Sequence, residues 1–175
     1  VQIAQLDLSY ALLYSVWSKS LKHEFIAPIR LGHILLGCGL VGLIRGGLVF
    51  LAMAAMSVGL ARACFDASLK YAKERVQFGK PIFSFQAISF KIADMAMHIE
   101  LARNMYLKAA WLKDNNLPHT LEAAYAKLFS SEMAERCASD AFQIHGGYGF
   151  MNEYSVSRYF KTSKILQIVE GTSEI

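Results

Sequence analysis

Apolar residues recur at alternating steps of three and four along the middle of the chain. This seam consists of Phe85, Ile88, Ile92, Met95, Ile99, Ala102, Tyr106 and Ala109. Such spacing places one apolar stripe on a helix of about seven turns. Ser84 is suited to cap its start, and Asn115, Asn116 and Pro118 are typical of its end. The pattern therefore predicts a long amphipathic helix that packs within a bundle.

Three further helices are predicted around this one. Residues 48–73 are rich in Ala and Met, lack proline, and become amphipathic only towards the end. Thr120 is suited to cap a third helix over residues 120–142, which the glycines of residues 146–149 would end. A shorter fourth helix is predicted from near Asn152 towards Ile165. Because no segment alternates as a strand does, the predicted fold is an all-α antiparallel four-helix bundle.

Length and composition set the domain organisation. The chain has 175 residues, enough for one domain with a real core, and 54% of them are hydrophobic while 18% are charged, which excludes a disordered chain. We predict that residues 48–175 form the bundle domain. Residues 1–47 stay unassigned and are interpreted as a non-native or truncated junction, because the first 30 residues show no period. The chain is accordingly expected to be a fragment.

Charge and cysteine usage argue against several classes of protein. The net charge is +4, but the basic residues are dispersed, so no nucleic-acid partner is predicted. The three cysteines form no CxxC pair and the five histidines form no HxxxH pair, which disfavours a disulfide framework and a metal site. Residues 31–61 are the most apolar stretch. Its longest uninterrupted part, residues 48–61, is shorter than the ~20 residues of a membrane span, so a core helix is preferred to a membrane segment.

Three segments contain the candidate chemistry. They are YAKERVQFGKPI at residues 71–82, FQIHGGYGF at 142–150 and ILQIVEGTSEI at 165–175. In this order and spacing they resemble the carboxy-terminal domain of the acyl-CoA dehydrogenase family, and FQAISFKIADMAMHIELAR resembles that family's second bundle helix. The resemblance covers residues 51–175. It implies an FAD-dependent enzyme that removes hydrogen from the α and β carbons of an acyl-CoA thioester.

The resemblance assigns the catalytic base to Glu170. A carboxylate with apolar neighbours becomes a stronger base when substrate expels water, because desolvation raises its pKa. Gly171 then gives clearance for the thioester. Some family members place the base on the first bundle helix, but the matching residue here is Val49, which cannot accept a proton. The alternative is that Glu170 is an ordinary surface glutamate.

The resemblance also implies a set of flavin-binding residues. They are Arg75, Gln77, Phe78, Gln86, Gln143, Gly146, Gly147, Thr172 and Glu174. Arg75 can pair with the pyrophosphate through its planar guanidinium, Phe78 can pack on the adenine or ribose, and the glycine turn allows backbone N–H groups to approach the dinucleotide. Taken singly, each residue has an equally good alternative interpretation: Arg75 as a solvated loop cation, Phe78 as a core residue, and the glycines of residues 146–149 as a helix terminator.

Partners and location also follow from the resemblance. It implies a homo-oligomer, a dimer or a tetramer, in which Arg75 and the glycine turn serve a neighbouring subunit's flavin, and it implies an electron-transferring flavoprotein as the reoxidising partner. The expected location is the mitochondrial matrix or the bacterial cytoplasm. The family's amino-terminal helical domain and middle β-barrel have no counterpart upstream, so this chain alone is not expected to hold FAD tightly or to be active. The alternatives are an acyl-CoA oxidase, a non-catalytic helical bundle and a small membrane protein.

Overall fold

A computed structural model describes residues 31–169 and residue 173, with side chains from residue 49 onward. The elements follow one another as α3 (Leu31–Glu74), β1 (Val76–Gln77), β2 (Lys80–Pro81), the 3-10 helix η1 (Ile82–Ser84), α4 (Gln86–Asp114), α5 (Thr120–His145), the 3-10 helix η2 (Gly146–Phe150) and α6 (Val156–Ile168). Contacts divide the chain into two units, residues 1–49 and residues 50–175. The second unit holds the bundle, and the predicted boundary at residue 48 stays a prediction.

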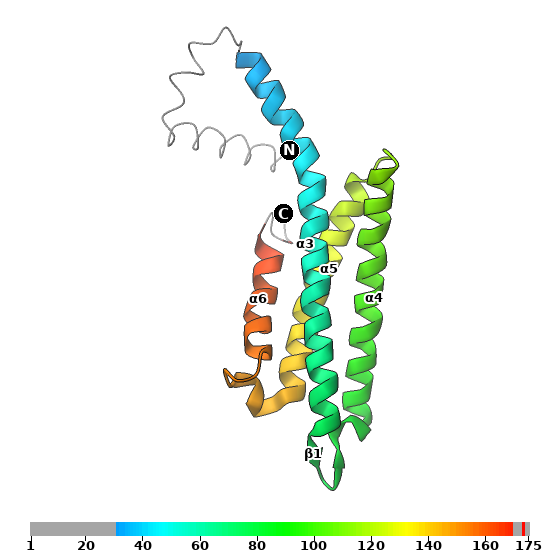
Figure 1. Cartoon of the computed structure of the whole chain (residues 1–175), viewed down its shortest axis with the longest axis vertical. Helices are drawn as coiled ribbons and strands as arrows, with labels where there is room; N and C mark the ends of the chain where they lie inside the picture. Colours follow the sequence, from blue (N-terminus) through cyan, green and yellow to red (C-terminus); the bar gives the residue numbers. More distant parts are fainter. Residues whose placement is uncertain (1–30, 170–172, 174–175) are drawn as a thin grey trace. The chain divides into compact units, whose positions relative to one another are not determined.

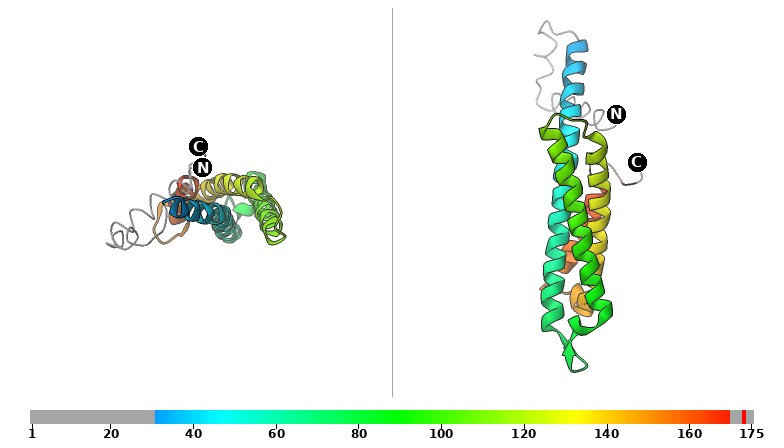
Figure 2. Two further views of the ribbon diagram at one scale, coloured as in Figure 1. Left: turned by 90° about the horizontal axis from the view of Figure 1, so that it is seen from above. Right: turned by 90° about the vertical axis from the view of Figure 1, so that its right-hand side faces the viewer.

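The second unit is an antiparallel helical bundle, as predicted. Successive helices reverse direction, with α5 packed between α4 and α6 (Figure 1). The side-on view in Figure 2 shows α4 and α5 running alongside each other over most of their length. The prediction of an all-α four-helix fold is therefore confirmed.

Helices α3 and α6 begin at residues that differ from those predicted from the sequence. Helix α3 begins at Leu31 rather than near residue 48. Residues 31–47 contain no proline, and the leucines among their glycines favour a helix. Helix α6 begins at Val156 rather than near Asn152. The preceding residues form turns, in which the Tyr154 N–H donates to the Met151 carbonyl at 3.2 Å.

The predicted side-chain caps are wrong at both sites. Ser84 belongs to η1, and the residue that caps α4 is Phe85, whose extended backbone makes no side-chain bond to the helix. Thr120 is the first residue of α5, and His119 takes the cap position, also without a side-chain bond. Both starts rely on backbone hydrogen bonds. At α4 the Ser89 N–H donates to the Phe85 carbonyl at 3.0 Å, and at α5 the Ala123 N–H donates to the His119 carbonyl at 2.9 Å.

A short hairpin joins α3 to η1, where no strand was predicted. Val76 pairs with Pro81 and Gln77 with Lys80, and the two-residue turn consists of Phe78 and Gly79. Both turn residues have positive φ, 52° and 78°, which is the signature of a type I′ turn. Strands of two residues are too short to show alternation, so the sequence pattern could not reveal them.

The core confirms the predicted seam of α4. Ile92, Met95, Ile99, Ala102 and Ala109 are buried. Much of the remaining interior consists of small side chains from α3 and α5. They include Ala61, Cys64, Ala72, Ala134, Cys137, Ala138 and Ala141, each at most 2% exposed. Small interior residues allow helix axes to approach closely, so the bundle is held by tight helix contacts as well as by large apolar groups.

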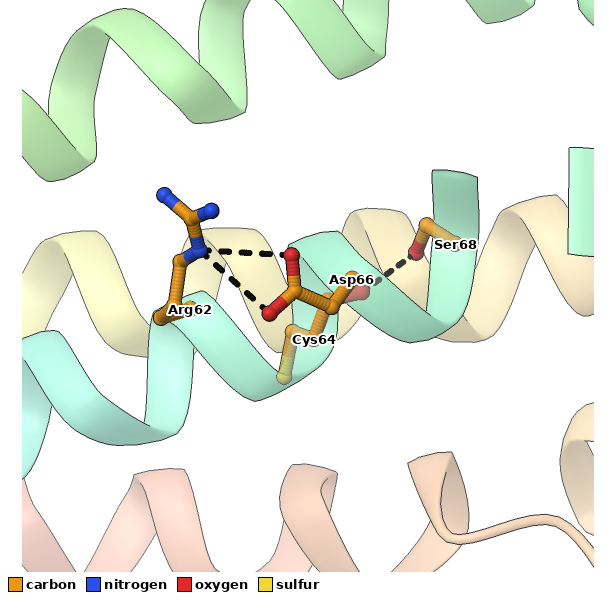
Figure 3. A network of polar contacts seen from close by, with 4 residues as sticks. All are labelled: Arg62, Cys64, Asp66 and Ser68. Carbon is orange, nitrogen blue, oxygen red and sulfur yellow. Dashed lines mark hydrogen bonds and ion pairs between the residues drawn. The ribbon is translucent and has the colours of Figure 1, made fainter. Parts of the chain in front are cut away.

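Polar groups on α3 are satisfied within the helix. The buried Ser68 hydroxyl donates to the Cys64 carbonyl at 2.7 Å, and on the outer face Arg62 pairs with Asp66 at 3.2 Å (Figure 3). The hydroxyl bond removes the cost of an unpaired buried donor. The surface ion pair is exposed at both ends and contributes at most about 1 kcal/mol.

Part of α3 is long and apolar enough to cross a membrane, by length and composition alone. This part is Val49–Glu74, with a mean hydropathy of 1.5. In the bundle the same stretch supplies Val58, Ala61, Cys64 and Ala72 to the core. About a third of its 18-residue apolar window (33%) is buried in the bundle, and core helices can pass the same test of length and composition.

The buried thiols give a testable prediction. Burial raises the pKa of the Cys64 thiol to about 12, and the neighbouring Cys137 adds to this increase. Burial also raises the pKa of the Cys137 thiol to about 12; Asp140 adds to this increase and Arg136 opposes it. Because the ordinary value is 9.0, the thiolate fraction at pH 8 falls by about a thousandfold. We expect neither thiol to be alkylated by iodoacetamide in the folded protein at pH 8, and both to react in guanidinium. Peptide mass spectrometry would follow each site, and rapid native labelling of either would contradict the packing.

Candidate functional site

One pocket lies where the end of α3, the hairpin and the end of α5 come together. Its open volume is about 560 Å³. The lining residues are Tyr71, Arg75, Gln77, Ile82, Ile144, His145, Gly146, Gly147, Tyr148 and Met151. Figure 1 shows the hairpin and the segment that follows α5 towards the same end of the bundle. The pocket therefore joins two of the three candidate segments, which are about 60 residues apart in the chain.

Arg75 is held firmly at the junction between α3 and β1. Its N–H donates to the Tyr71 carbonyl and its carbonyl accepts from the Ile82 N–H, both at 2.8 Å. Its guanidinium carbon lies over the ring of Tyr148, 5.4 Å from the ring centroid. Within residues 49–169, no carboxylate forms an ion pair with Arg75. Among the described side chains, the pocket thus contains a half-buried cation without a carboxylate partner, which favours an anionic ligand.

Four rings pack together beneath this cation. Tyr71 stacks on His145 with centroids 4.3 Å apart, and Tyr154 meets the edges of both, at 5.9 Å from Tyr71 and 5.7 Å from His145. Tyr148 completes the cluster, 5.5 Å from Tyr154 and 6.4 Å from Tyr71. Aromatic pairs at these separations stabilise a structure by about 0.5–1.5 kcal/mol beyond their area. The cluster gives the pocket a rigid aromatic wall.

His145 contributes to this wall as a neutral ring. It is buried, and its Nδ1 lies 2.8 Å from the Ala141 carbonyl, so Nδ1 carries the proton and donates. Burial lowers the pKa of His145, and the bond to the carbonyl opposes this change. Burial also raises the pKa of the Tyr71 hydroxyl, while the charge of Arg75 acts in the opposite direction. Among the pocket's titratable groups, Arg75 is the one that carries charge at neutral pH.

The three glycines of the turn after α5 differ in why a glycine stands at each position. Gly146 ends α5 with a φ of 57°, a conformation that favours glycine. A Cβ at Gly149 would lie 3.0 Å from the Phe142 carbonyl oxygen and 3.2 Å from its ring, so Gly149 is needed for packing. A Cβ at Gly147 would meet nothing within 4 Å. Gly147 is therefore an uncrowded residue in the pocket lining.

The pocket brings together four of the predicted flavin-binding residues, Arg75, Gln77, Gly146 and Gly147. Phe78 lies at the hairpin tip and is 92% exposed, so its interpretation as a core residue is wrong. Gln86 and Gln143 are exposed and do not line the pocket. The remaining predicted residues, Glu170, Gly171, Thr172 and Glu174, lie outside the described residues.

Sequence reasoning did not single out the aromatic residues of the pocket. Tyr71, His145 and Tyr148 all lie inside the quoted motifs, yet roles were assigned only to other residues of these motifs. One signal was present, because Tyr71 and Arg75 are four residues apart at the end of a helix and so belong on one face. The contact between Arg75 and Tyr148 joins distant segments and leaves no local pattern.

The fold and the pocket define an all-α domain with an Arg75-containing pocket at one end of its bundle. Comparison with known families identifies it further. A family model described as the acyl-CoA dehydrogenase C-terminal domain matches residues 51–175. The chain therefore belongs to the acyl-CoA dehydrogenase family, whose curated members are oxidoreductases.

Individual relatives agree with this assignment. A probable acyl-CoA dehydrogenase of Bacillus subtilis (strain 168) is 65% identical over 125 residues, which cover 71% of this chain and 33% of the relative. The solved butyryl-CoA dehydrogenase of Megasphaera elsdenii superposes with a TM-score of 0.76 at 45% identity, covering 78% of this chain and 36% of that one. A chain from a structure described as the electron-transferring flavoprotein of Acidaminococcus fermentans gives a TM-score of 0.70 at 45% identity, covering 71% and 33%. The chain spans about a third of the length of the curated relatives it matches.

Proposed function

We propose that this chain is the flavin-contacting carboxy-terminal part of an FAD-dependent acyl-CoA dehydrogenase. The observation that carries the proposal is a pocket in which Arg75, which pairs with no carboxylate among residues 49–169, lies together with the uncrowded glycines Gly146 and Gly147. Both features favour a phosphate-containing ligand, and homologues in the family are generally FAD-dependent.

The residues present fit a dinucleotide. Arg75 would pair with the pyrophosphate through its planar donors, and the N–H groups at Gly146 and Gly147 would approach the same part of the ligand. Phe78, bare at the tip of the hairpin and held at positive φ, is a backbone outlier of the kind that gathers at binding sites. It is suited to pack against the adenine or ribose. When bound, FAD supplies the acceptor for a hydride from the substrate's β carbon.

Glu170 is the proposed base for the other half of the reaction. Its carboxylate takes the proton from the α carbon, the α C–H electrons form the new double bond, and the β hydrogen leaves with its electron pair. Gly171 leaves room for the thioester beside it, and Thr172 and Glu174 are proposed to contact the flavin. Proton removal by this route needs a desolvated carboxylate, and hydride removal needs an oriented hydride acceptor; neither step needs a metal.

A homo-oligomer and an electron-transferring flavoprotein are the proposed partners. Exposed apolar side chains on α4 and α5 support association of the bundle. They include Phe90, Met97, Leu101, Trp111, Leu121 and Tyr125, each at least 49% exposed. Apolar surface of this extent is typical of an interface. The relative from Acidaminococcus fermentans supports a flavoprotein partner for this chain's parent enzyme.

Purification of the full-length protein tests the proposed function. We expect a yellow protein with about one FAD per chain, whose visible absorbance is bleached anaerobically by an acyl-CoA and restored by an electron-transferring flavoprotein. Restoration by oxygen alone would assign the chain to an oxidase. A colourless full-length protein that gains no flavin on incubation with FAD would contradict the proposal.

A further inference from the structure

The contact between Arg75 and Tyr148 differs from the usual way in which a partly buried arginine is fixed. Each ion pair between side chains of residues 49–169 joins a cation to a carboxylate, and none includes Arg75. A carboxylate partner would occupy two or more of the five guanidinium N–H donors. The face of an aromatic ring attracts the cation without accepting any of these bonds.

Tyr148 is itself well supported for such a role. Its ring packs against Tyr154 at 5.5 Å and against Tyr71 at 6.4 Å, and Tyr71 is in turn stacked on the buried His145. Its carbonyl accepts from the Met151 N–H at 3.1 Å, which fixes the backbone of η2 at this point. The ring is 43% exposed, so it lies at the mouth of the pocket and not within the core.

The backbone of Arg75 is fixed independently of this ring. Hydrogen bonds to Tyr71 and Ile82 hold the residue on either side of its Cα, but they do not restrain a side chain with four rotatable bonds. Among the described residues, the cation–π contact with Tyr148 is therefore the interaction that orients the guanidinium itself.

We propose that Tyr148 is a positioning residue for Arg75, holding the guanidinium by its ring face so that the N–H donors stay free for the anionic part of a dinucleotide. This inference rests on the proposed FAD site. It goes beyond that site because it gives a role to a residue that contacts the ligand through Arg75 alone. The role depends on the ring and not on the hydroxyl.

Two substitutions of Tyr148 separate the effect of its aromatic ring from the effect of its side-chain volume. Tyr148→Phe keeps the aromatic face, whereas Tyr148→Leu keeps a similar apolar volume without it. In deflavinated full-length protein titrated with FAD, we expect Tyr148→Leu to raise the Kd about 3-fold to 30-fold, the range of a cation–π contact. We expect Tyr148→Phe to stay within about 2-fold of the unsubstituted protein, because it keeps the ring.

The same pair in an Arg75→Ala background tests whether Tyr148 acts through Arg75. With the guanidinium absent, Tyr148→Leu is expected to change the Kd by less than about 2-fold, since contacting residues are not additive. An equal loss in both backgrounds, or a loss in Tyr148→Phe as large as in Tyr148→Leu, would overturn the inference. Far-UV circular dichroism of each variant checks that the bundle is intact.

A measurement without FAD separates this inference from the proposed function. Phenylglyoxal reacts with the neutral guanidine, and a cation–π contact favours the charged form. Arg75 in deflavinated Tyr148→Leu should therefore be modified about 3-fold faster or more than in Tyr148→Phe, as followed by peptide mass spectrometry. If the full-length protein binds no FAD, the proposed function fails while these rates still decide whether Tyr148 holds Arg75. Equal rates would then overturn the inference.

Discussion

Replacement of Glu170 by Gln in the full-length protein should leave the flavin bound but nearly abolish its bleaching by acyl-CoA. The amide has the shape of the carboxylate and cannot take the α proton, so the loss should be about 10²-fold to 10⁴-fold, the range of general-base catalysis. Anaerobic stopped-flow measurement of the visible flavin absorbance gives the rate directly. The FAD content of the variant, read from the same spectrum, shows whether binding is retained.

Two further variants sharpen the test of Glu170. Glu153→Gln makes the same chemical change at an exposed position in the turn before α6, and it should bleach at the unsubstituted rate. Glu170→Asp keeps a carboxylate on a shorter side chain and should fall between the Gln variant and the unsubstituted protein. Bleaching of Glu170→Gln at the normal rate would assign the base to a different residue.

Replacement of Met95 by Ala is expected to destabilise the bundle more than any other methionine substitution on α4. Met95 is 2% exposed and belongs to the core formed by all four helices. Removal of its side chain should lower the free energy of unfolding by about 2–5 kcal/mol, through lost burial and the cavity left behind. Urea unfolding of the 175-residue chain, followed by far-UV circular dichroism, measures the loss.

Met97 supplies the matched control on the same helix. Met97→Ala removes the same atoms from a side chain that is 51% exposed, so the change should stay within about 0.5 kcal/mol. A loss at Met97 that depends on protein concentration would report association through the outer face of α4. Equal losses at both positions, independent of concentration, would show that α4 packs in a different register.

Where every turn of a helix repeats the same signal, the sequence predicts the structure well. Along α4 the expected seam coincides with the buried face at Ile92, Met95, Ile99 and Ala102. Each of these positions is apolar because it faces the core, so a misinterpretation of one residue would not change the predicted helix. The glycine turn predicted to end α5 does so at Gly146, which has a positive φ, although the helix continues to His145 and not only to Phe142.

Features that depend on a single residue or on distant contacts were predicted less well. Ser84 and Thr120 are good cap residues by composition, but the chain enters both helices through backbone geometry one residue away. The start of α3 at Leu31 was not predicted, because the apolar and glycine residues before residue 48 show no helical period. The pocket arises from segments about 60 residues apart. Its charged and glycine residues were predicted from the resemblance, whereas the supporting ring of Tyr148 was not.

The small side chains in the bundle's interior also constrain how this domain diverges over evolutionary time. Ala61, Ala102 and Ala138 are fully buried on three different helices of one core. A mutation that enlarges such a residue forces neighbours to move at a cost of about 1–3 kcal/mol. Lineages can therefore exchange outer residues freely while the spacing between helices is inherited almost unchanged, and with it the distance between the two segments that form the pocket.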